Sequence, residues 1–313
     1  MANKSISVAA PATVANVACG FDALGFAVNS PSDVVTMRML DEPGIRILPV
    51  RGPYGEGLST DPAKNTAGVA VASFLKRIKS IQGFEIILYK NLPLGSGLGS
   101  SAASSAAAVF AANELMGRPL AVEALIPCAM EAEKIACGAA HADNVAPALL
   151  GGFVLIRSYE PLDIVHIPCP ENLFCTLLHP HVELRTEDSR KILRSEIKLI
   201  DAITQWSNLA GLIAGLITAN YPLIGRSLQD VIIEPIRSVL IPGFDVIKQA
   251  ALKNGVLGCS ISGSGPSIFA LSTDEATANK AGQAMQQALS EIDLTSDLFV
   301  SRINMHGAQV IKF

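Results

Sequence analysis

The chain has 313 residues, of which 50% are hydrophobic and 17% are charged, and its formal net charge is −4. This composition supports a large buried core and argues against an intrinsically disordered chain. Because no block of the sequence is strongly basic, nucleic acid is not expected as a partner.

The first half of the chain shows alternating signals for strands and helices. Segments rich in branched apolar residues predict strands, and apolar residues repeating on one face predict helices. In order, we expect strands at 5–10, 33–40 and 44–50, a loop at 51–64, a helix at 65–80, a strand at 84–89, helices at 101–116 and 119–137, and a strand at 151–158. Pro127 marks a break within 119–137.

The second half begins with a strand and continues mainly as helices. We expect a strand at 173–180, a long helix at 186–206, further helix at 207–220 and 243–254, strands at 256–262 and 267–273, a helix at 274–290, and strands at 298–304 and 308–313. The mixture predicts an α+β fold. We place a domain boundary at 155–170 and divide the chain into residues 1–160 and 161–313.

Targeting and redox signals point to the cytoplasm. Residues 1–16 lack the long apolar core of a signal peptide, and the apolar run at 209–221 is too short to span a membrane. The six cysteines form no C-x-x-C pair, which is typical of reduced, buried thiols. We therefore expect a soluble cytoplasmic protein with no membrane partner.

The stretch PLGSGLGSSAASSAA at 93–107 places three glycines between a predicted strand and a predicted helix. Glycine adopts positive φ and lets main-chain N–H groups approach a ligand, and a helix start adds unpaired N–H groups and partial positive charge. The pattern suits a phosphate chain, with Ser100 and Ser101 available to phosphate oxygens or Mg²⁺. From composition alone, a tight turn before a closely packed helix explains this run of glycine, serine and alanine equally well.

Familiar phosphate motifs do not match these glycines. No lysine follows them as a P-loop requires, and their spacing is G-x-G-x-G, not the G-x-G-x-x-G of dinucleotide-binding folds. The serines also lack the G-x-S-x-G context of an esterase.

The segment from Pro93 to Ala103 instead resembles the phosphate loop of the GHMP small-molecule kinases. Segments at 11–28, 133–153, 185–193, 234–244 and 261–271 resemble further parts of the same family. The resemblance implies two domains, one like domain 2 of ribosomal protein S5 and one ferredoxin-like, with ATP and an alcohol meeting between them. Many members are dimers, so it also allows a homodimer.

The resemblance also assigns residues to ATP and Mg²⁺. The phosphate loop comprises Pro93, Leu94, Gly95, Ser96, Gly97, Leu98, Gly99, Ser100, Ser101, Ala102 and Ala103, and further nucleotide contacts are expected from Asn65, Thr66 and Lys90. Mg²⁺ prefers hard oxygen ligands, and Ser101 and Glu133 are the candidates. Glu131, two residues earlier on the same predicted helix, faces another direction and is the weaker candidate.

For the acceptor, the resemblance implies L-homoserine, phosphorylated on its side-chain hydroxyl for threonine biosynthesis. The expected substrate residues are Asn16, Asp22, His141, Thr186, Arg190, Arg237, Gly263, Ser264 and Gly265. Arginine suits a carboxylate, and aspartate suits an ammonium group. Gly263, Ser264 and Gly265 are also placed to brace the phosphate loop.

Two alternatives remain open from the residues alone. The first is another small alcohol such as mevalonate, which carries a carboxylate but no cation. The second is a non-catalytic metabolite sensor on the same scaffold. The catalytic base is also open. Asp143 matches the position of a base in mevalonate kinase-like members. The resemblance equally allows the proton to pass to phosphate without a dedicated base, in which case Asp143 and Asn144 would orient other groups and hold the loop.

Overall fold

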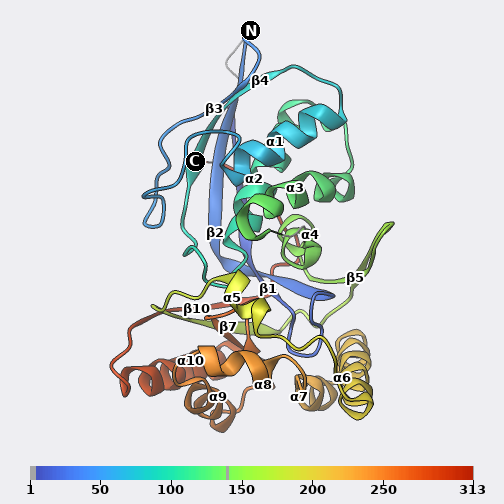
Figure 1. Cartoon of the computed structure of the whole chain (residues 1–313), viewed down its shortest axis with the longest axis vertical. Helices are drawn as coiled ribbons and strands as arrows, with labels where there is room; N and C mark the ends of the chain where they lie inside the picture. The colour runs from blue at the N-terminus through green and yellow to red at the C-terminus, as the bar shows by residue number, and fades with distance from the viewer. Residues whose placement is uncertain (1–4, 139–140, 313) are drawn as a thin grey trace.

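The structure is a computed structural model that describes residues 5–138 and 141–312 (Figure 1). Its first sheet has seven strands: β1 (Ser5–Ala15), β2 (Leu24–Leu40), β3 (Ile45–Ile47), β4 (Gly83–Tyr89), β5 (Phe153–Tyr159), β6 (Leu162–Ile167) and β11 (Gln309–Ile311). The main order is β11-β1-β2-β4-β3, and β5 pairs with both β2 and β6. The C-terminal strand therefore returns to the sheet that begins the chain.

Helices cover one face of this sheet (Figure 1). They are α1 (Thr66–Arg77), α2 (Ser100–Leu115), α3 (Ile126–Cys137) and α4 (Ala142–Leu150), with a 3₁₀ turn at Val122–Leu125. The helix α2 is buried along most of its length, and its alanines and serines let β1, β2, α1 and α3 pack closely around it. This burial gives α2, and the loop before it, a rigid position.

The second sheet has the order β10-β7-β9-β8 and is antiparallel. Its strands are β7 (Phe174–Pro180), β8 (Gly258–Ile261), β9 (Ile268–Ser272) and β10 (Ser296–Arg302), and α9 (Phe244–Lys253) and α10 (Glu275–Ser290) pack against it. The remaining helices are α5 (Thr186–Lys191), α6 (Leu199–Ile217), α7 (Tyr221–Ser227) and α8 (Glu234–Arg237), with a 3₁₀ turn at Ser238–Leu240. No helix within the described ranges is long and apolar enough to cross a membrane.

Most predicted elements are confirmed, but the single helix expected at 186–206 is wrong. Residues 192–198 are not helical and separate α5 from α6. The short α5 is tied to the loop after β8, because the Ser189 hydroxyl donates to the Ser264 carbonyl oxygen at 3.0 Å. This tertiary contact fixes α5 apart from α6, against a continuous local helical signal.

Other differences are smaller. Pro127 does not break a helix but lies in the first turn of α3, where its missing N–H costs nothing. The helix α4 and the strand β6 were not predicted. The boundary at residue 160 stays a prediction, although residues 160 and 161 lie within the β5–β6 hairpin and the chain changes sheets between Ile167 and Phe174. Phe313, the last residue of the predicted final strand, lies outside the described residues.

Candidate active site

A cavity of about 370 Å³ lies where the two halves of the chain meet. The phosphate loop, α1 and α3 line one part of it, and α5, Arg237 and the loop after β8 line another. The cavity therefore joins the two glycine-containing segments that the sequence places far apart.

The phosphate loop confirms the predicted strand, loop and helix start. Gly95, Gly97 and Gly99 have φ of +62°, +77° and +66°. Gly99 is the N-cap of α2, and it provides no side-chain cap, so the first amides of α2 remain available to an anion. An added Cβ at Gly97 would lie 2.3 Å from the Ser262 carbonyl oxygen, so this glycine also allows close backbone packing.

Gly99 and Gly95 form a matched pair for testing the loop. Both have nearly the same positive φ, but a Cβ at Gly99 would lie 1.9 Å from Thr13 Oγ1, whereas a Cβ at Gly95 would meet nothing nearer than 4.0 Å. We expect Gly99→Ala to lower the free energy of unfolding by about 2–5 kcal/mol, and Gly95→Ala by about 1–2 kcal/mol from backbone strain alone. Urea denaturation of both variants measures the difference, and equal losses would contradict the packing role of Gly99.

The loop after β8, at residues 262–267, contacts the phosphate loop. This agrees with the bracing role expected for this loop. The Ser262 hydroxyl donates to the Gly97 carbonyl oxygen at 2.7 Å, and the Ser267 amide donates to the Ser96 carbonyl oxygen at 3.1 Å. Gly263 and Ser264 line the cavity, whereas Gly265 does not and lies behind Gly97. These contacts couple the phosphate loop to the C-terminal half.

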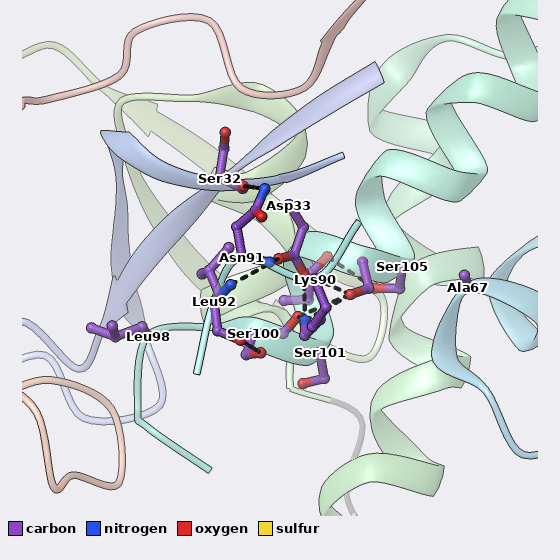
Figure 2. A network of polar contacts seen from close by, with 12 residues as sticks. Ser32, Asp33, Ala67, Lys90, Asn91, Leu92, Leu98, Ser100, Ser101 and Ser105 are labelled. Atoms are coloured by element: carbon purple, nitrogen blue, oxygen red, sulfur yellow. Dashed lines mark hydrogen bonds and ion pairs between the residues drawn. The ribbon is translucent and has the colours of Figure 1, made fainter. Parts of the chain in front are cut away.

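Lys90 anchors the start of α2, and Figure 2 shows it beside Asp33 and Ser100. Its side chain is 2% exposed, and its ammonium contacts the Asp33 carboxylate, the Ser100 carbonyl oxygen at 2.5 Å and the Ser104 hydroxyl at 2.8 Å. Burial lowers the pKa of Lys90, and the Asp33 charge opposes that shift. All three donors of the ammonium have partners inside the protein, and Lys90 also lines the cavity, so its contact with phosphate stays a prediction.

Asp33 extends this support to the loop itself. Its second carboxylate oxygen accepts hydrogen bonds from the amides of Asn91 and Leu92, at 2.8 and 3.0 Å (Figure 2). One carboxylate thus holds both the residues before the phosphate loop and, through Lys90, the first turn of α2. The sequence analysis missed Asp33, because its only local signal is a charge within an apolar strand.

Ser101 and Glu133 meet at the cavity, as the metal prediction requires. The Ser101 hydroxyl donates to Glu133 Oε2 at 3.0 Å, and the Glu133 residue is 5% exposed. Glu131 instead points to solvent and pairs with Lys134 at 2.7 Å. No cluster of three or more acidic, histidine or cysteine side chains that suits a metal occurs among the described residues.

The acceptor end of the cavity combines opposite charges. Asp22 accepts two hydrogen bonds from the Arg190 guanidinium, at 2.8 and 3.2 Å, and lies 3.9 Å from His141 Nδ1. The ring of Phe21 contacts both Arg190 and Arg237, whose guanidinium carbons lie 5.6 and 5.0 Å from its centroid. Phe21 is a further residue that the sequence analysis missed.

Arg237 is almost fully buried and held by main-chain oxygens. It donates to the carbonyl oxygens of Ser189 and Gly263, both at 3.1 Å. Burial, together with the nearby positive charge of Arg190, lowers its pKa to about 10, so it remains charged at neutral pH. A buried cation held beside a second one favours an anionic ligand.

The other predicted acceptor residues also converge on this end. Asn16 donates to the Gly263 carbonyl oxygen at 2.7 Å and accepts from the Asp22 amide at 3.0 Å. The hydroxyls of Thr186 and Ser264 are 3.1 Å apart. Burial lowers the pKa of His141, so a neutral imidazole faces the cavity at pH 7. These polar groups come from four separate segments of the chain.

Asp143 and Asn144 lie between the phosphate and acceptor ends. Asp143 is 3% exposed, and burial, with Asp22 as the next cause, raises its pKa to about 7. Its Oδ1 atom has no hydrogen-bond partner among the described residues. Asn144 accepts a hydrogen bond from the Thr13 hydroxyl at 2.7 Å, which fixes its orientation.

Some predicted loop residues support the site without facing it. Pro93, Leu98, Ala102 and Ala103 are buried and do not line the cavity. On the nucleotide side, Asn65 caps α1 by accepting from the Ala67 amide at 3.0 Å, and both Asn65 and Thr66 line the cavity. The sequence analysis missed further lining residues on this side, which are Leu58, Ser59, Lys64 and Ile135.

Family models and solved structures define the class of this protein. Residues 65–152 match the model "GHMP kinases N terminal domain", and residues 209–291 match "GHMP kinases C terminal". Solved structures with distant sequences share the fold, such as a mevalonate kinase of Leishmania major at 15% identity, with a TM-score of 0.72 over 96% of this chain and 95% of that one. The chain belongs to the GHMP kinase family and has its two-domain architecture.

Its much closer relatives are homoserine kinases. Those of Chlorobium phaeobacteroides (strain BS1) and Chlorobaculum tepidum are each 51% identical, over 98% and 99% of this chain and 100% and 99% of their own. A crystal structure of homoserine kinase from Cytophaga hutchinsonii is 55% identical, with a TM-score of 0.95 over 99% of this chain and 98% of that one. These similarities extend over nearly the whole chain.

Proposed function

We propose that this protein transfers the γ-phosphoryl group of ATP to the side-chain hydroxyl of L-homoserine, giving O-phospho-L-homoserine for threonine biosynthesis in the cytoplasm. The observation that carries the proposal is a single cavity that holds an anion-binding glycine loop and a paired carboxylate and guanidinium. Relatives named homoserine kinase, at 51% identity over nearly the whole chain, support the same acceptor.

The acceptor end suits a zwitterion. Arg190 and Arg237 offer planar donors to a carboxylate, and Asp22 offers a carboxylate to an ammonium group. Mevalonate has no cation for Asp22, and the structures of mevalonate kinases are only 15–16% identical to this chain. The presence of Ser101 and Glu133 at the cavity also favours catalysis over a non-catalytic sensor.

The residues at the phosphate end fit a magnesium ion. Mg²⁺ is commonly held by one or two protein oxygens together with substrate phosphates, and Glu133 with Ser101 provides such a pair. When bound, the ion would neutralise charge that develops on the β- and γ-phosphates. The amides of the glycine loop and of α2 would bind the phosphate oxygens and orient the terminal phosphorus toward the acceptor.

Asp143 is the proposed acceptor of the homoserine hydroxyl proton. A general base works best when its pKa is close to the working pH, and the pKa of Asp143 is about 7. It lines the cavity that contains both substrate ends. Asn144, held by Thr13, would orient the groups around the transferred phosphoryl.

The activity is tested by measuring ADP release with a panel of small alcohols, with and without Mg²⁺. We expect turnover with L-homoserine, none with mevalonate, and loss of turnover when EDTA removes Mg²⁺. Detection of O-phospho-L-homoserine by mass spectrometry identifies the product. Turnover on mevalonate without turnover on homoserine would overturn the proposal.

Asp22→Asn tests the recognition of the ammonium group. We expect the KM for homoserine to rise about 10- to 100-fold, since a charged hydrogen bond contributes roughly 1.5–3 kcal/mol. The KM for ATP should stay within twofold (about 0.4 kcal/mol), because Asp22 belongs to the acceptor end. Asp245→Asn, at an exposed position on α9 away from the cavity, is the control and should leave both constants unchanged. Equal changes in the two KM values would contradict this role for Asp22.

A further inference from the structure

Tyr159, the last residue of β5, carries a hydroxyl group that joins two segments of the acceptor end. The hydroxyl donates to the Asp22 carbonyl oxygen at 3.1 Å and accepts from the Ala142 amide at 3.3 Å. A carbonyl oxygen only accepts and an amide N–H only donates, so an atom that does both is needed to bridge them directly. The phenol hydroxyl is such an atom, and it links the loop that carries Asp22 to the start of α4.

The contact with Ala142 caps α4 from outside the helix. The first amides of a helix have no partner within it and need one elsewhere. His141 is the N-cap residue of α4, but its side chain makes no capping hydrogen bond. The Ala142 amide, the first of the helix, donates to Tyr159 instead. This contact therefore holds the helix end from which Asp143, the second residue of α4, lines the cavity.

The two polar side chains at the start of α4 leave atoms available to a ligand. His141 Nε2 and Asp143 Oδ1 are buried and have no hydrogen-bond partner among the described residues. Both residues line the cavity. The ring of Tyr159 meets the His141 ring edge-on, with 6.4 Å between the centroids. Because these free atoms do not fix α4, its position relative to the acceptor loop depends on other contacts, including the one with Tyr159.

The contact with Asp22 holds the acceptor loop at the other end of the bridge. Asp22 has φ of +55°, which is uncommon for a residue other than glycine and persists only when its surroundings support it. Its amide donates to Asn16 and its carbonyl oxygen accepts from Tyr159, so both of its main-chain polar groups have partners. The Asp22 carboxylate is thereby held beside Arg190 and His141.

The Tyr159 hydroxyl keeps its proton when Asp143 changes charge. Burial, with Asp143 among the further causes, raises the pKa of Tyr159 above its usual value of about 10. A phenolate could not donate to the Asp22 carbonyl oxygen, so a raised pKa preserves the bridge. The bridge therefore stays intact at pH values around 7, where Asp143 ionises.

We propose that Tyr159 is a positioning residue for phosphoryl transfer, which sets the place of Asp22 relative to Asp143 by bridging the main chains beside them. This inference rests on the proposed function, because it requires homoserine to lie between these two carboxyl groups. Tyr159 does not line the cavity and acts through its two partners. A displacement of about 1 Å at a reacting centre can lower a rate about 100-fold, so a bridge made of two hydrogen bonds is enough to affect catalysis.

Tyr159→Phe tests this role, because it removes the hydroxyl and keeps the ring. We expect the KM for homoserine to rise about 5- to 10-fold, the effect of one lost hydrogen bond. We expect kcat to fall about 10-fold through misplacement of Asp143, and the KM for ATP to stay within about twofold. Tyr221→Phe is the matched control, since it removes a phenol hydroxyl that contacts Asn172 away from the cavity, and it should change none of these constants.

Two further measurements separate positioning from a loss of folding. The helix α4 also packs directly on β2, where a Cβ at Gly25 would lie 1.8 Å from the Asp143 carbonyl oxygen, so the fold should persist without the hydroxyl. The Tm of Tyr159→Phe should stay within about 4 °C of that of the unaltered protein. Added to Asp143→Asn, the same substitution should lower kcat by less than about threefold further, because the carboxylate that it positions is already gone.

The unaltered chain is measured first, so that failure of the proposed function is recognised by itself. Absence of turnover with homoserine in that chain would overturn the proposed function and this inference with it. Turnover that Tyr159→Phe leaves unchanged would overturn the inference alone. The inference would also be wrong if kcat fell equally with and without Asp143, or if the KM for ATP rose as much as the KM for homoserine.

Discussion

Replacing Glu133 with glutamine is expected to lower kcat about 10²- to 10³-fold, the effect of losing one electrostatic group that stabilises a transition state. The amide oxygen of glutamine can still accept the hydrogen bond that Ser101 donates at 3.0 Å, so the local geometry should persist. What is lost is the negative charge that would hold Mg²⁺ against the phosphates. Steady-state ADP release at saturating Mg²⁺ and ATP measures the change.

Glu131→Gln is the matched control, because it makes the same chemical change two residues earlier on α3. Glu131 is solvent-exposed and pairs with Lys134, so the kcat of the Glu131→Gln variant should equal that of the unaltered protein. Titration with a fluorescent ATP analogue, with and without Mg²⁺, separates metal binding from folding. A kcat for Glu133→Gln within about twofold of the control, a difference of roughly 0.4 kcal/mol, would rule out the carboxylate as the metal ligand.

The second large effect is expected for Asp143→Asn, which should lower kcat about 10²- to 10⁴-fold, the usual contribution of a general base. In the unaltered protein the pKa of Asp143 is raised to about 7, so the carboxylate is neutral below pH 7 and charged above it. Only the charged form accepts a proton. Activity should therefore rise with pH through about 7, and this limb of the profile should be absent in Asp143→Asn.

The same substitution should stabilise the fold at alkaline pH. Because the pKa of Asp143 is higher in the folded protein than its usual value of 3.8, ionisation disfavours the folded state as pH rises from about 4 to about 7. Asparagine removes that cost. Denaturation at pH 5 and pH 8 should show a gain in the free energy of unfolding at both pH values, and the gain should be larger at pH 8. A variant with full kcat and an unchanged pH profile would leave Asp143 with an orienting role alone.

The phosphate loop was predictable because its signals are local. Positive φ favours glycine, and a run of alanine and serine after it favours a buried helix, so Gly95, Gly97 and Gly99 could be interpreted without knowing what surrounds them. The strands around the loop were equally clear from branched apolar residues. The long match to one kinase family then extended this interpretation to Glu133, Asp22 and Arg190.

Contacts between distant segments were not predictable in this way. From the sequence, Lys90 resembled a free cation before a phosphate loop. Only the fold brings Asp33 of β2 next to it, where the two form a buried ion pair. The helix signal at 186–206 was continuous, yet residues 192–198 are not helical, and Ser189 of α5 is hydrogen-bonded to the distant Ser264. Phe21 and the lining residues near Ser59 likewise acquire their place only when separate elements meet.

The sequence by itself determined the α+β class, the glycine loop with its helix start, the family and the chemical type of the site residues that it predicted. These depend on the backbone preferences and chemistry of single residues and their immediate neighbours. The tertiary structure decided which charges neutralise one another and which loop residues face the cavity. Each of these depends on how distant segments pack together, as with Asp22 and Arg190, which are 168 residues apart in the sequence.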